Sequence, residues 1–525
     1  MVANKQQRPQ SVSAVKAIYR DPGLDCYRGN PLIEPLPPIF TEEMIAHLLQ
    51  YSPGYEEGYR ELPLEHRLHL IVDAVRFIQP LPIHLRLEQC FSRMIRSGYV
   101  GRNPSAPKFQ SLYRRLQAVG DDPLELPPPV LTTRGCSIVG HSGAGKSTAA
   151  GRILSMYPQV IYHGRYNNRP FTHSQLVYIK LECPYNGELS GLCKGFFTEV
   201  DRVLDTHTYE RYVRYGQPRI DDLLLRMAEL AFRHSIGVLV IDEIQNLRKA
   251  RGDGANDMLD FLLWLDNKLG IPVVLVGTPR ALPVLTGEFR RARRAAGQEA
   301  IAWNRMREDG NDWTLFTDTL WKYQYVHTNS ILTPELRHVL YDQSQGIADI
   351  AVKVYMLAQI EAITSRAEVI TPESLIAASH HRLSFVQPFL SDLRDNVAPE
   401  KIEDPDDLAE VDLEQIIQEE LDRIYESSSQ AADEGEHTQP QEDASADSEQ
   451  EQAFQTKVSS GRAPEQGQPK QAGGTVAWLA LVQARKEGKR QHIAPYGALN
   501  AAGYIRQAME YLLTEMRGPS QEECA

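Results

Sequence analysis

The chain has 525 residues, of which 42% are hydrophobic and 24% are charged, a composition typical of globular proteins with about two to four domains. Its apolar runs are far shorter than the roughly 20 residues of a membrane-spanning helix, and its first residues, MVANKQQRPQ, lack the apolar segment of a signal peptide. Its six cysteines are scattered without metal-like spacing. We therefore expect a soluble cytosolic protein with reduced thiols, without zinc or disulfides.

The formal net charge of -13 is concentrated in one segment. Between Glu403 and Glu465 the chain carries 20 Asp or Glu and 3 Lys or Arg, so the rest of the chain is mildly basic. A mildly basic folded part is compatible with a nucleic-acid partner, although the whole chain is acidic.

The N-terminal region, up to about residue 105, is rich in proline and aromatic residues, and a helix is predicted around Leu81 to Ile95. From Arg134 onward, short β-branched runs alternate with amphipathic helical stretches. This alternation predicts a parallel sheet covered by helices. The predicted strands are 136–140, 176–181, 238–241 and 273–276, with 320–326 as the candidate fifth strand.

From about Thr333 to Arg394 the pattern becomes mostly helical. One of these helices is predicted to begin at Thr371, as its N-cap, with Pro372 in the first turn. Residues 427–474 are rich in Ser, Gln, Asp, Glu and Gly and poor in large apolar side chains, so they are predicted to be a disordered linker. A short apolar segment follows the linker at the C-terminus.

The strongest motif is GHSGAGKST, which matches G-x-x-x-x-G-K-[ST] and lies between a predicted strand and a predicted helix. Its glycines allow backbone N–H groups to surround phosphate oxygens, and the helix N-terminus adds a positive dipole end. Lys146 is predicted to contact the β- and γ-phosphates of ATP, and the Ser147 hydroxyl to bind Mg²⁺. The predicted nucleotide-binding residues are Gly140, His141, Ser142, Gly143, Ala144, Gly145, Lys146, Ser147 and Thr148.

A second motif, GVLVIDEIQNL, consists of an apolar strand that ends in Asp242 and Glu243. An apolar run followed by Asp-Glu is also typical of a strand that simply reaches a solvated loop. Paired with the phosphate loop, it predicts that Asp242 holds Mg²⁺ and that Glu243 orients and deprotonates the attacking water.

The next predicted strand ends in Thr278, which could sense the water or the γ-phosphate, although Thr before Pro also commonly starts a turn. Four arginines follow within a short stretch: Arg290, Arg291, Arg293 and Arg294. Such a cluster is usually a solvated helix face. We predict that at least one of them reaches the γ-phosphate on a neighbouring subunit, which would make hydrolysis depend on assembly.

In the helical region, Lys353 could reach the same nucleotide, although an ion pair with Asp349 one helical turn earlier explains it nearly as well. DNA contacts are harder to locate, because a protein that follows the DNA backbone needs only Lys, Arg and small polar side chains. The candidates are Lys180, Lys194, Arg165 and Arg169, with scattered solvated charges as the alternative.

Together these motifs resemble the AAA+ superfamily, and several segments are more specific. AIYRDPGLDCYRGNPLIEPLPP, MIRSGYVGRNP, YPQVIYH, VLVIDEIQNL, VGTPRA, RRARRAAG and SQGIADIAVKV resemble the TnsC family, the ATP-dependent regulators of TnsABCD-type (TniB/TnsC) transposition, over most of residues 14–395. The resemblance implies ATP-dependent assembly on double-stranded DNA as a homo-oligomeric ring or filament in a bacterial cytosol. It also implies a TnsD/TniQ-type target selector and a TnsA/TnsB-type transposase as partners, and it supports the nucleotide roles of 140–148, 242, 243, 278 and 290–294.

The expected fold is α/β: an AAA+ P-loop NTPase with a parallel five-stranded sheet flanked by helices, a helical lid, and a disordered acidic C-terminal linker. The expected domains are an N-terminal partner-docking region (1–105), the nucleotide-binding core (106–330), the lid (331–400), the acidic linker (401–474) and a C-terminal segment (475–525) that by analogy binds the transposase.

Two other functions remain open. One is an ATP-binding scaffold whose hydrolysis is incidental, which would have no use for a positioned base such as Glu243. The other is an initiator or helicase loader of the AAA+ type, which would carry a winged-helix DNA reader after the lid. Residues 400–525 are too acidic to fit such a reader well.

Overall fold

The computed structural model describes residues 13–106, 135–214, 218–286, 299–402, 413 and 415–423. Most of the predicted acidic linker and the whole C-terminal segment lie outside these residues. The same holds for the arginine cluster, including Arg290, Arg293 and Arg294.

The core is a five-stranded sheet in which all neighbouring strands are parallel. In spatial order the strands are β5 (Tyr178–Glu182), β6 (Val238–Asp242), β7 (Val273–Gly277), β2 (Cys136–Gly140) and β8 (Glu299–Trp303). The prediction of a parallel five-stranded sheet is therefore confirmed.

The predicted fifth strand at 320–326 is wrong, because the fifth strand is β8. Residues 311–320 form helix α11 (Asn311–Leu320), and the chain after it contains no strand as far as 326. Its apolar side chains, such as Trp321, Tyr323 and Tyr325, are buried in the core of the helical lid. The alternation of apolar residues in this segment reflects burial in that core, which short-range periodicity does not distinguish from a strand.

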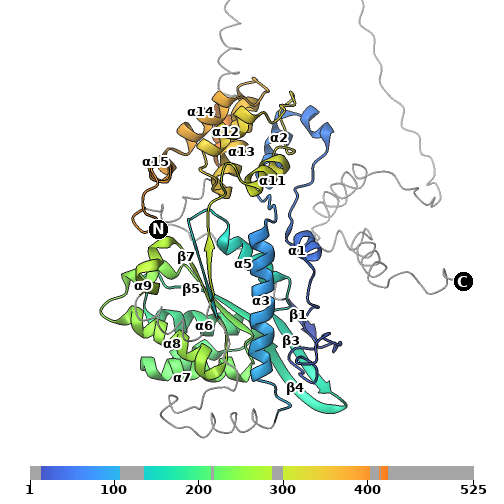
Figure 1. Cartoon of the computed structure of the whole chain (residues 1–525), viewed down its shortest axis with the longest axis vertical. Helices are drawn as coiled ribbons and strands as arrows, with labels where there is room; N and C mark the ends of the chain where they lie inside the picture. The colour runs from blue at the N-terminus through green and yellow to red at the C-terminus, as the bar shows by residue number, and fades with distance from the viewer. Residues whose placement is uncertain are drawn as a thin grey trace, which may run out of the picture. The chain divides into compact units, whose positions relative to one another are not determined.

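Helices cover both faces of the sheet (Figure 1). Successive strand residues point to opposite faces, so that Val238 and Val240 pack on one side of β6 while Leu239 and Ile241 pack on the other. The first face is covered by α1 (Glu42–Leu49), α3 (Pro82–Gly101) and α5 (Lys146–Ser155), and the second by α6 (Leu189–Leu204), α7 (Ile220–Arg233) and α8 (Gly254–Leu269). The predicted helix around 81–95 is α3.

The region predicted as the lid, residues 331–400, is helical, and it contains α12 (Pro334–Asp342), α13 (Ala348–Thr364), α14 (Pro372–Arg382) and α15 (Gln387–Arg394). Helix α11, which the predicted boundary at 330 assigned to the nucleotide-binding core, packs into the same hydrophobic core as these helices. Helix α13 is buried on almost every side and forms the centre of this layer. Thr371 is the N-cap of α14, and its hydroxyl accepts a hydrogen bond of 3.2 Å from the Ser374 backbone. Helix α2 (Leu64–Ala74), from the N-terminal region, packs into the same hydrophobic core.

A second sheet was not predicted from the sequence. It contains β1 (Ala14–Lys16), β3 (Val160–Tyr166) and β4 (Arg169–Leu176), and the β3–β4 hairpin extends beyond the core (Figure 1). Asn167 and Asn168 adopt φ values of 47° and 63°, as the favoured two-residue hairpin turn requires. The Asn-Asn pair between two alternating segments was the signal that could have revealed the hairpin.

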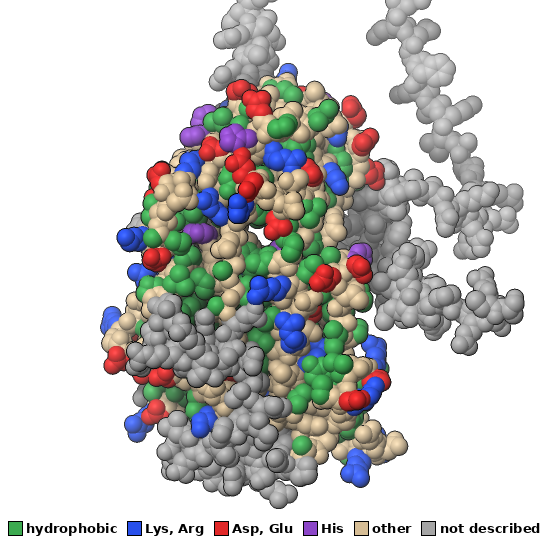
Figure 2. Space-filling view, viewed as in Figure 1, with side chains coloured by type: hydrophobic (Ala, Val, Ile, Leu, Met, Phe, Trp, Pro, Cys, Tyr) green, Lys and Arg blue, Asp and Glu red, His purple; other side chains and the backbone are tan. Residues whose placement is uncertain are grey.

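The remaining elements are short: η1 (Glu57–Glu61), η3 (Glu210–Arg214), η4 (Ile244–Lys249), η5 (Pro279–Ala281), α9 (Leu282–Thr286) and η6 (Ser384–Val386). Within the described part of the chain, no helix has the length and apolar character that crossing a membrane requires. On the face shown in Figure 2, acidic and basic side chains are interspersed, and the surface is hollowed where the lid meets the core.

Candidate functional site

The phosphate loop follows β2 and leads into α5. Gly143 and Gly145 have φ values of 72° and 95°, in the left-handed region that favours glycine, and α5 begins directly afterwards at Lys146. Gly140 is required for a different reason, because a Cβ there would overlap the carbonyl oxygen of Trp303 on the neighbouring strand β8. The loop is therefore shaped by its own glycines and by the adjacent strand.

The structure brings the phosphate loop and the end of β6 together. The Ser147 hydroxyl donates a 2.9 Å hydrogen bond to Oδ1 of Asp242. The Lys146 amino group is almost fully buried and donates a 2.7 Å hydrogen bond to the carbonyl oxygen of His141, within the loop. Ser147 and Asp242 are thus adjacent, as the predicted Mg²⁺ site requires.

Lys180 is a component of this site that the sequence analysis placed elsewhere, among the candidate DNA contacts. Its amino group lies 3.0 Å from Oδ2 of Asp242. It extends from β5, the strand beside β6, and its side chain is 34% exposed while that of Asp242 is 5% exposed. Lys180 therefore belongs to the acidic strand end rather than to an open surface.

Glu243 directly follows β6 and adopts a φ of 56°, which is uncommon for a residue with a side chain. Its carboxylate accepts a hydrogen bond from the Gln245 side-chain amide. The oxygen of the same amide accepts a 3.1 Å hydrogen bond from the Thr278 backbone N–H. Gln245, which sequence reasoning did not single out, thus connects the two residues predicted to act on the attacking water.

The Thr278 hydroxyl is buried, and no partner lies within hydrogen-bond distance of it among the described residues. A buried hydroxyl without a partner is costly, at about 1–3 kcal/mol. A water molecule or a phosphate oxygen at this position would satisfy it, so the site fits a nucleotide here.

The lid contacts the phosphate loop directly. The backbone N–H of Asp349, at the start of α13, donates a 3.1 Å hydrogen bond to the carbonyl oxygen of Gly143. The Phe389 ring on α15 lies 5.8 Å from the His141 ring. Lys353 forms the ion pair with Asp349, at 2.7 Å, that the sequence offered as its alternative role. Lys353 lies one turn beyond the helix end that contacts the loop, and its predicted role toward nucleotide stays a prediction.

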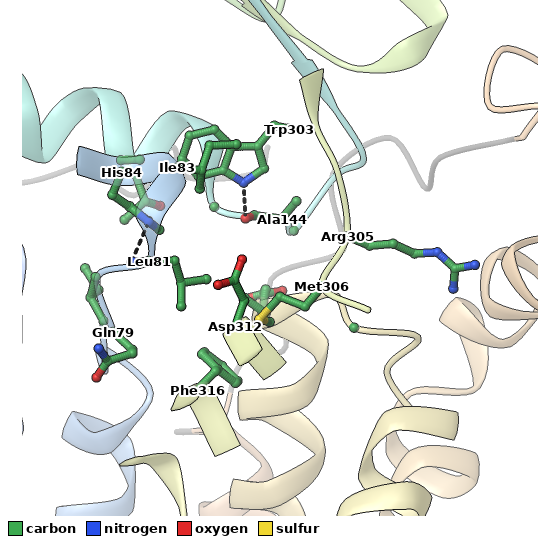
Figure 3. Close-up of a pocket in the computed structure, with 18 of the residues that line it drawn as sticks. Gln79, Leu81, Ile83, His84, Ala144, Trp303, Arg305, Met306, Asp312 and Phe316 are labelled. Atoms are coloured by element: carbon green, nitrogen blue, oxygen red, sulfur yellow. Dashed lines mark hydrogen bonds between the residues drawn. The ribbon is translucent and has the colours of Figure 1, made fainter. Parts of the chain in front are cut away.

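A cavity of about 860 Å³ lies beside the phosphate loop, between the core, the lid and the N-terminal helices. Predicted residues Gly143, Ala144, Gly145 and Thr148 line one side of it. Trp303 lines it from β8, and its indole N–H donates a 2.8 Å hydrogen bond to the Ala144 carbonyl oxygen (Figure 3). The volume is sufficient for a nucleoside, so the cavity is a candidate place for one beside the phosphate loop.

His84 gives this cavity a polar group whose protonation can be assigned. The Leu81 backbone N–H donates to Nδ1 of His84 at 3.1 Å, so the neutral ring carries its proton on Nε2. Burial lowers the pKa of His84 to about 4, which keeps the ring neutral at physiological pH. Its ring packs edge-on against Trp303, 5.1 Å between centroids, and both lie on the same side of the cavity (Figure 3).

Arg305 follows Trp303 but does not face the same way, since its guanidinium points away from the other labelled residues (Figure 3). It donates hydrogen bonds to the Gln345 side chain at 2.8 Å and to the Leu393 carbonyl oxygen at 3.1 Å. Arg305 therefore joins the end of β8 to the lid.

The two predicted metal ligands, Ser147 Oγ and Asp242, are oxygen donors, which Mg²⁺ prefers together with phosphate oxygens. No group of three or more His, Cys, Asp or Glu residues suited to a metal occurs among the described residues. The arrangement therefore suits a metal that arrives with a phosphate ligand better than one held by the protein alone.

Comparison with known proteins identifies a domain family for part of the chain. Residues 131–285 match the family model described as AAA domain. No curated protein matches the chain. Membership of the TnsC family therefore remains an expectation from the sequence.

Among solved structures, the Aeropyrum pernix ORC1 protein in complex with DNA is 16% identical, with a TM-score of 0.34, over 57% of this chain and 72% of that one. Cdc6p from Pyrobaculum aerophilum is 17% identical, with a TM-score of 0.33, over 52% and 68%. The Thermotoga maritima RuvB branch migration motor is 14% identical, with a TM-score of 0.27, over 48% and 62%. Residues 131–285 of the chain therefore match an AAA domain, and β8, beyond residue 285, completes the parallel sheet of this region.

Proposed function

We propose that the protein is a Mg²⁺-dependent ATPase that acts as a DNA-binding regulator of transposition. The observation that carries the ATPase part is the meeting of the phosphate loop with the acidic end of β6, where Ser147 contacts Asp242 at 2.9 Å. Glu243 and Thr278 lie at the same edge and share Gln245. A phosphate clamp, an oxygen pair for the metal and a base beside them are what phosphoryl transfer to water needs.

In this proposal each group has a distinct task. The Lys146 amino group exchanges the His141 carbonyl for the β- and γ-phosphates of ATP. Ser147 and Asp242 hold Mg²⁺, which neutralises charge on the transferred phosphoryl group. Glu243 accepts the proton of the attacking water, and the unsatisfied Thr278 hydroxyl orients that water or the γ-phosphate. Arg290, Arg293 or Arg294 of a neighbouring subunit stabilises the transition state.

The regulatory part rests on the resemblance of segments across residues 14–395 to TnsC proteins and on the mildly basic charge outside 403–465. In this function the ATP-bound chain oligomerises on target DNA and receives a target signal from a TnsD/TniQ-type protein. It then recruits the TnsA/TnsB-type transposase, and hydrolysis resets the assembly. The AAA domain provides the nucleotide-dependent element that such a switch requires.

Nucleotide binding and single-turnover hydrolysis, each with and without duplex DNA, test the proposal. Lys146→Ala should lose nucleotide affinity and ATP-dependent assembly. Assembly is to be measured by electron microscopy with a non-hydrolysable ATP analogue. Glu243→Gln should bind ATP and recruit transposase but fail to release it. Assembly by Lys146→Ala equal to that of the parent chain would contradict the proposal.

An initiator or helicase loader would use the same phosphate loop and acidic strand end, so the nucleotide site does not separate the two functions. Recruitment does. A regulator of transposition should bind the transposase in the ATP state, whereas a loader should bind a replicative helicase. An ATP-binding scaffold would differ from the regulator and from the loader. Its Glu243→Gln variant would still bind the partner protein and would release it as fast as the parent chain does.

A further inference from the structure

The second sheet has an unusual charge content. The segments that contain its three strands, residues 13–20 and 160–176, include four cationic residues and no Asp or Glu. All four are exposed: Lys16, Arg20, Arg165 and Arg169. Burial lowers the pKa of His163, and it lowers that of His173 to about 4, so neither ring adds charge near neutral pH. Within these segments the formal charge is cationic only, although Asp21 directly follows the first segment and Glu34 contacts Tyr166 of β3.

Some of the other exposed arginines, unlike these cations, form ion pairs with carboxylates within the described part of the chain. Arg202 pairs with Glu199 at 2.6 Å, and Arg226 and Arg233 pair with Glu229 at 2.9 and 3.1 Å. Among the ion pairs between described residues, none includes a cation of the second sheet. An uncompensated cation attracts an external anion more strongly than one already paired on the surface.

The tip of the hairpin holds two of the cations in a defined place. In the strand register, Arg169 lies opposite Tyr166 across the turn. A bulge between His163 and Arg165 places Arg165 opposite Pro170. The guanidinium of Arg165 donates a 3.2 Å hydrogen bond to the Asn168 carbonyl oxygen. Arg165 and Arg169 therefore occupy adjacent register pairs at the end of a short turn, with side chains that start from opposite faces of the hairpin.

The hairpin is anchored to the N-terminal segment through Tyr166 and His163. The Tyr166 hydroxyl donates a 2.9 Å hydrogen bond to Glu34, whose same oxygen accepts from the Gly29 backbone at 2.8 Å. The Tyr19 hydroxyl lies 2.9 Å from Nδ1 of His163. Glu34 is thus engaged by internal donors, although its carboxylate keeps its negative charge, and the cations of the sheet remain exposed.

Tyr162 is an exposed aromatic residue of the same sheet. It is 42% exposed and stands beside Lys16 in the β1–β3 register. A tyrosine among cations is a common contact to phosphate and sugar, since its hydroxyl donates to phosphate and its ring packs on the sugar. One exposed aromatic ring does not form the stacking series that single strands need.

We propose that this sheet is a surface for the sugar–phosphate backbone of duplex DNA, with Arg165 and Arg169 as phosphate contacts at the hairpin tip. The inference rests on the proposed function and deepens it by naming where the DNA binds. It assigns the contact to two of the sequence candidates and excludes Lys180, which pairs with Asp242. Backbone contact by cations predicts binding that is independent of sequence and strongly dependent on salt.

The test is a salt series of duplex DNA affinity on the full chain with a non-hydrolysable ATP analogue. Arg165→Gln with Arg169→Gln should weaken binding at least about tenfold and reduce the slope of log affinity against log salt by about 2. Arg165→Lys with Arg169→Lys should keep the slope. The matched control, Arg226→Gln with Arg233→Gln, removes the same charge from α7 and should bind like the parent chain.

Two outcomes would overturn the inference: an unchanged slope in the hairpin variant, or an equal loss in the α7 control. Nucleotide affinity, measured on every variant, verifies that the fold is retained. Unchanged DNA binding by the hairpin variant would exclude this sheet as the DNA-binding surface but would leave the proposed function intact. Failure of the parent chain to bind duplex DNA in any nucleotide state removes both.

Discussion

Glu243 adopts an uncommon backbone conformation, and its carboxylate is bound by the side-chain amide of Gln245. Its φ of 56° costs about 1 kcal/mol or more for a residue with a Cβ, and such strain clusters at functional sites. Gln245 donates to its carboxylate and accepts from the Thr278 backbone. In the proposed function Gln245 is therefore a positioning residue, which would act on the attacking water through Glu243 and Thr278.

Gln245→Ala should lower the single-turnover rate of ATP hydrolysis about ten- to a hundred-fold and leave nucleotide affinity within about two-fold, because positioning of a base matters mainly in the transition state. If Gln245 acts through Glu243, adding Gln245→Ala to Glu243→Gln should lower the rate little further. Fully additive losses in the double variant would contradict this role.

His84 should make the fold sensitive to acid. Above pH 6.5 the ring is neutral in both states, whereas between pH 6.5 and about 4 only the unfolded chain takes up the proton, so the free energy of unfolding should decrease as pH falls through this range. His84→Asn cannot titrate, yet its side-chain oxygen can still accept from Leu81.

Urea unfolding at pH 7.5 and pH 5 measures this effect. The His84→Asn chain should lose less stability between the two pH values than the parent chain. His173, whose pKa is also lowered to about 4, should account for part of the decrease that remains. An equal decrease in variant and parent would show that His84 does not contribute.

At the scale of elements, the site depends on the contact between β2 and β8. The phosphate loop leaves β2 at Gly140, against the backbone of Trp303, and the Trp303 indole then holds the Ala144 carbonyl oxygen. Strand β8 thus positions both ends of the loop. A local motif in the sequence describes the loop, but its shape depends on a strand more than 150 residues away.

Gly140→Ala should destabilise the chain by several kcal/mol, because the new methyl group would overlap the Trp303 backbone, which cannot move without disrupting the sheet. Gly151→Ala in α5 is the matched control. Nothing lies within 4 Å of its new Cβ, and alanine favours a helix by about 1 kcal/mol over glycine, so stability should rise slightly. Thermal unfolding distinguishes the two, and similar midpoints would refute the argument.

At the scale of the whole molecule, the N-terminal helices connect the lid to the core. Helix α3 packs on the sheet, and α2 packs in the lid. The link to the lid includes Arg67, which is 3% exposed, pairs with Glu368 at 2.7 Å and donates to the Tyr325 carbonyl oxygen at 2.9 Å. Burial raises the pKa of Glu368, but the hydrogen bonds from Arg67 and the His327 backbone, with the charge of Arg67, outweigh it, so the pKa is below its usual value.

Arg67→Met should reduce the free energy of unfolding by about 3–5 kcal/mol, because it leaves the partly buried Glu368 carboxylate without its cation. Arg307→Met is the control, since its pair with Asp309 is 80% and 73% exposed and should contribute less than about 1 kcal/mol. Urea unfolding measures both. Equal effects would mean that the Arg67 pair does not stabilise the link between α2 and the lid.

The sequence by itself determined the phosphate loop, the acidic end of β6, the parallel α/β core and the helical lid, because each depends on spacing within a short segment. Only the tertiary structure decided that β8 is the fifth strand, that Lys180 pairs with Asp242, and that Gln245 joins Glu243 to Thr278. The Asn-Asn turn was a local sequence signal for the β3–β4 hairpin. No local sequence signal indicated that the hairpin is anchored to Glu34. Apart from the Glu243–Gln245 contact, these contacts join residues that are distant in the chain, and the order of strands in the sheet, rather than local periodicity, brings them together.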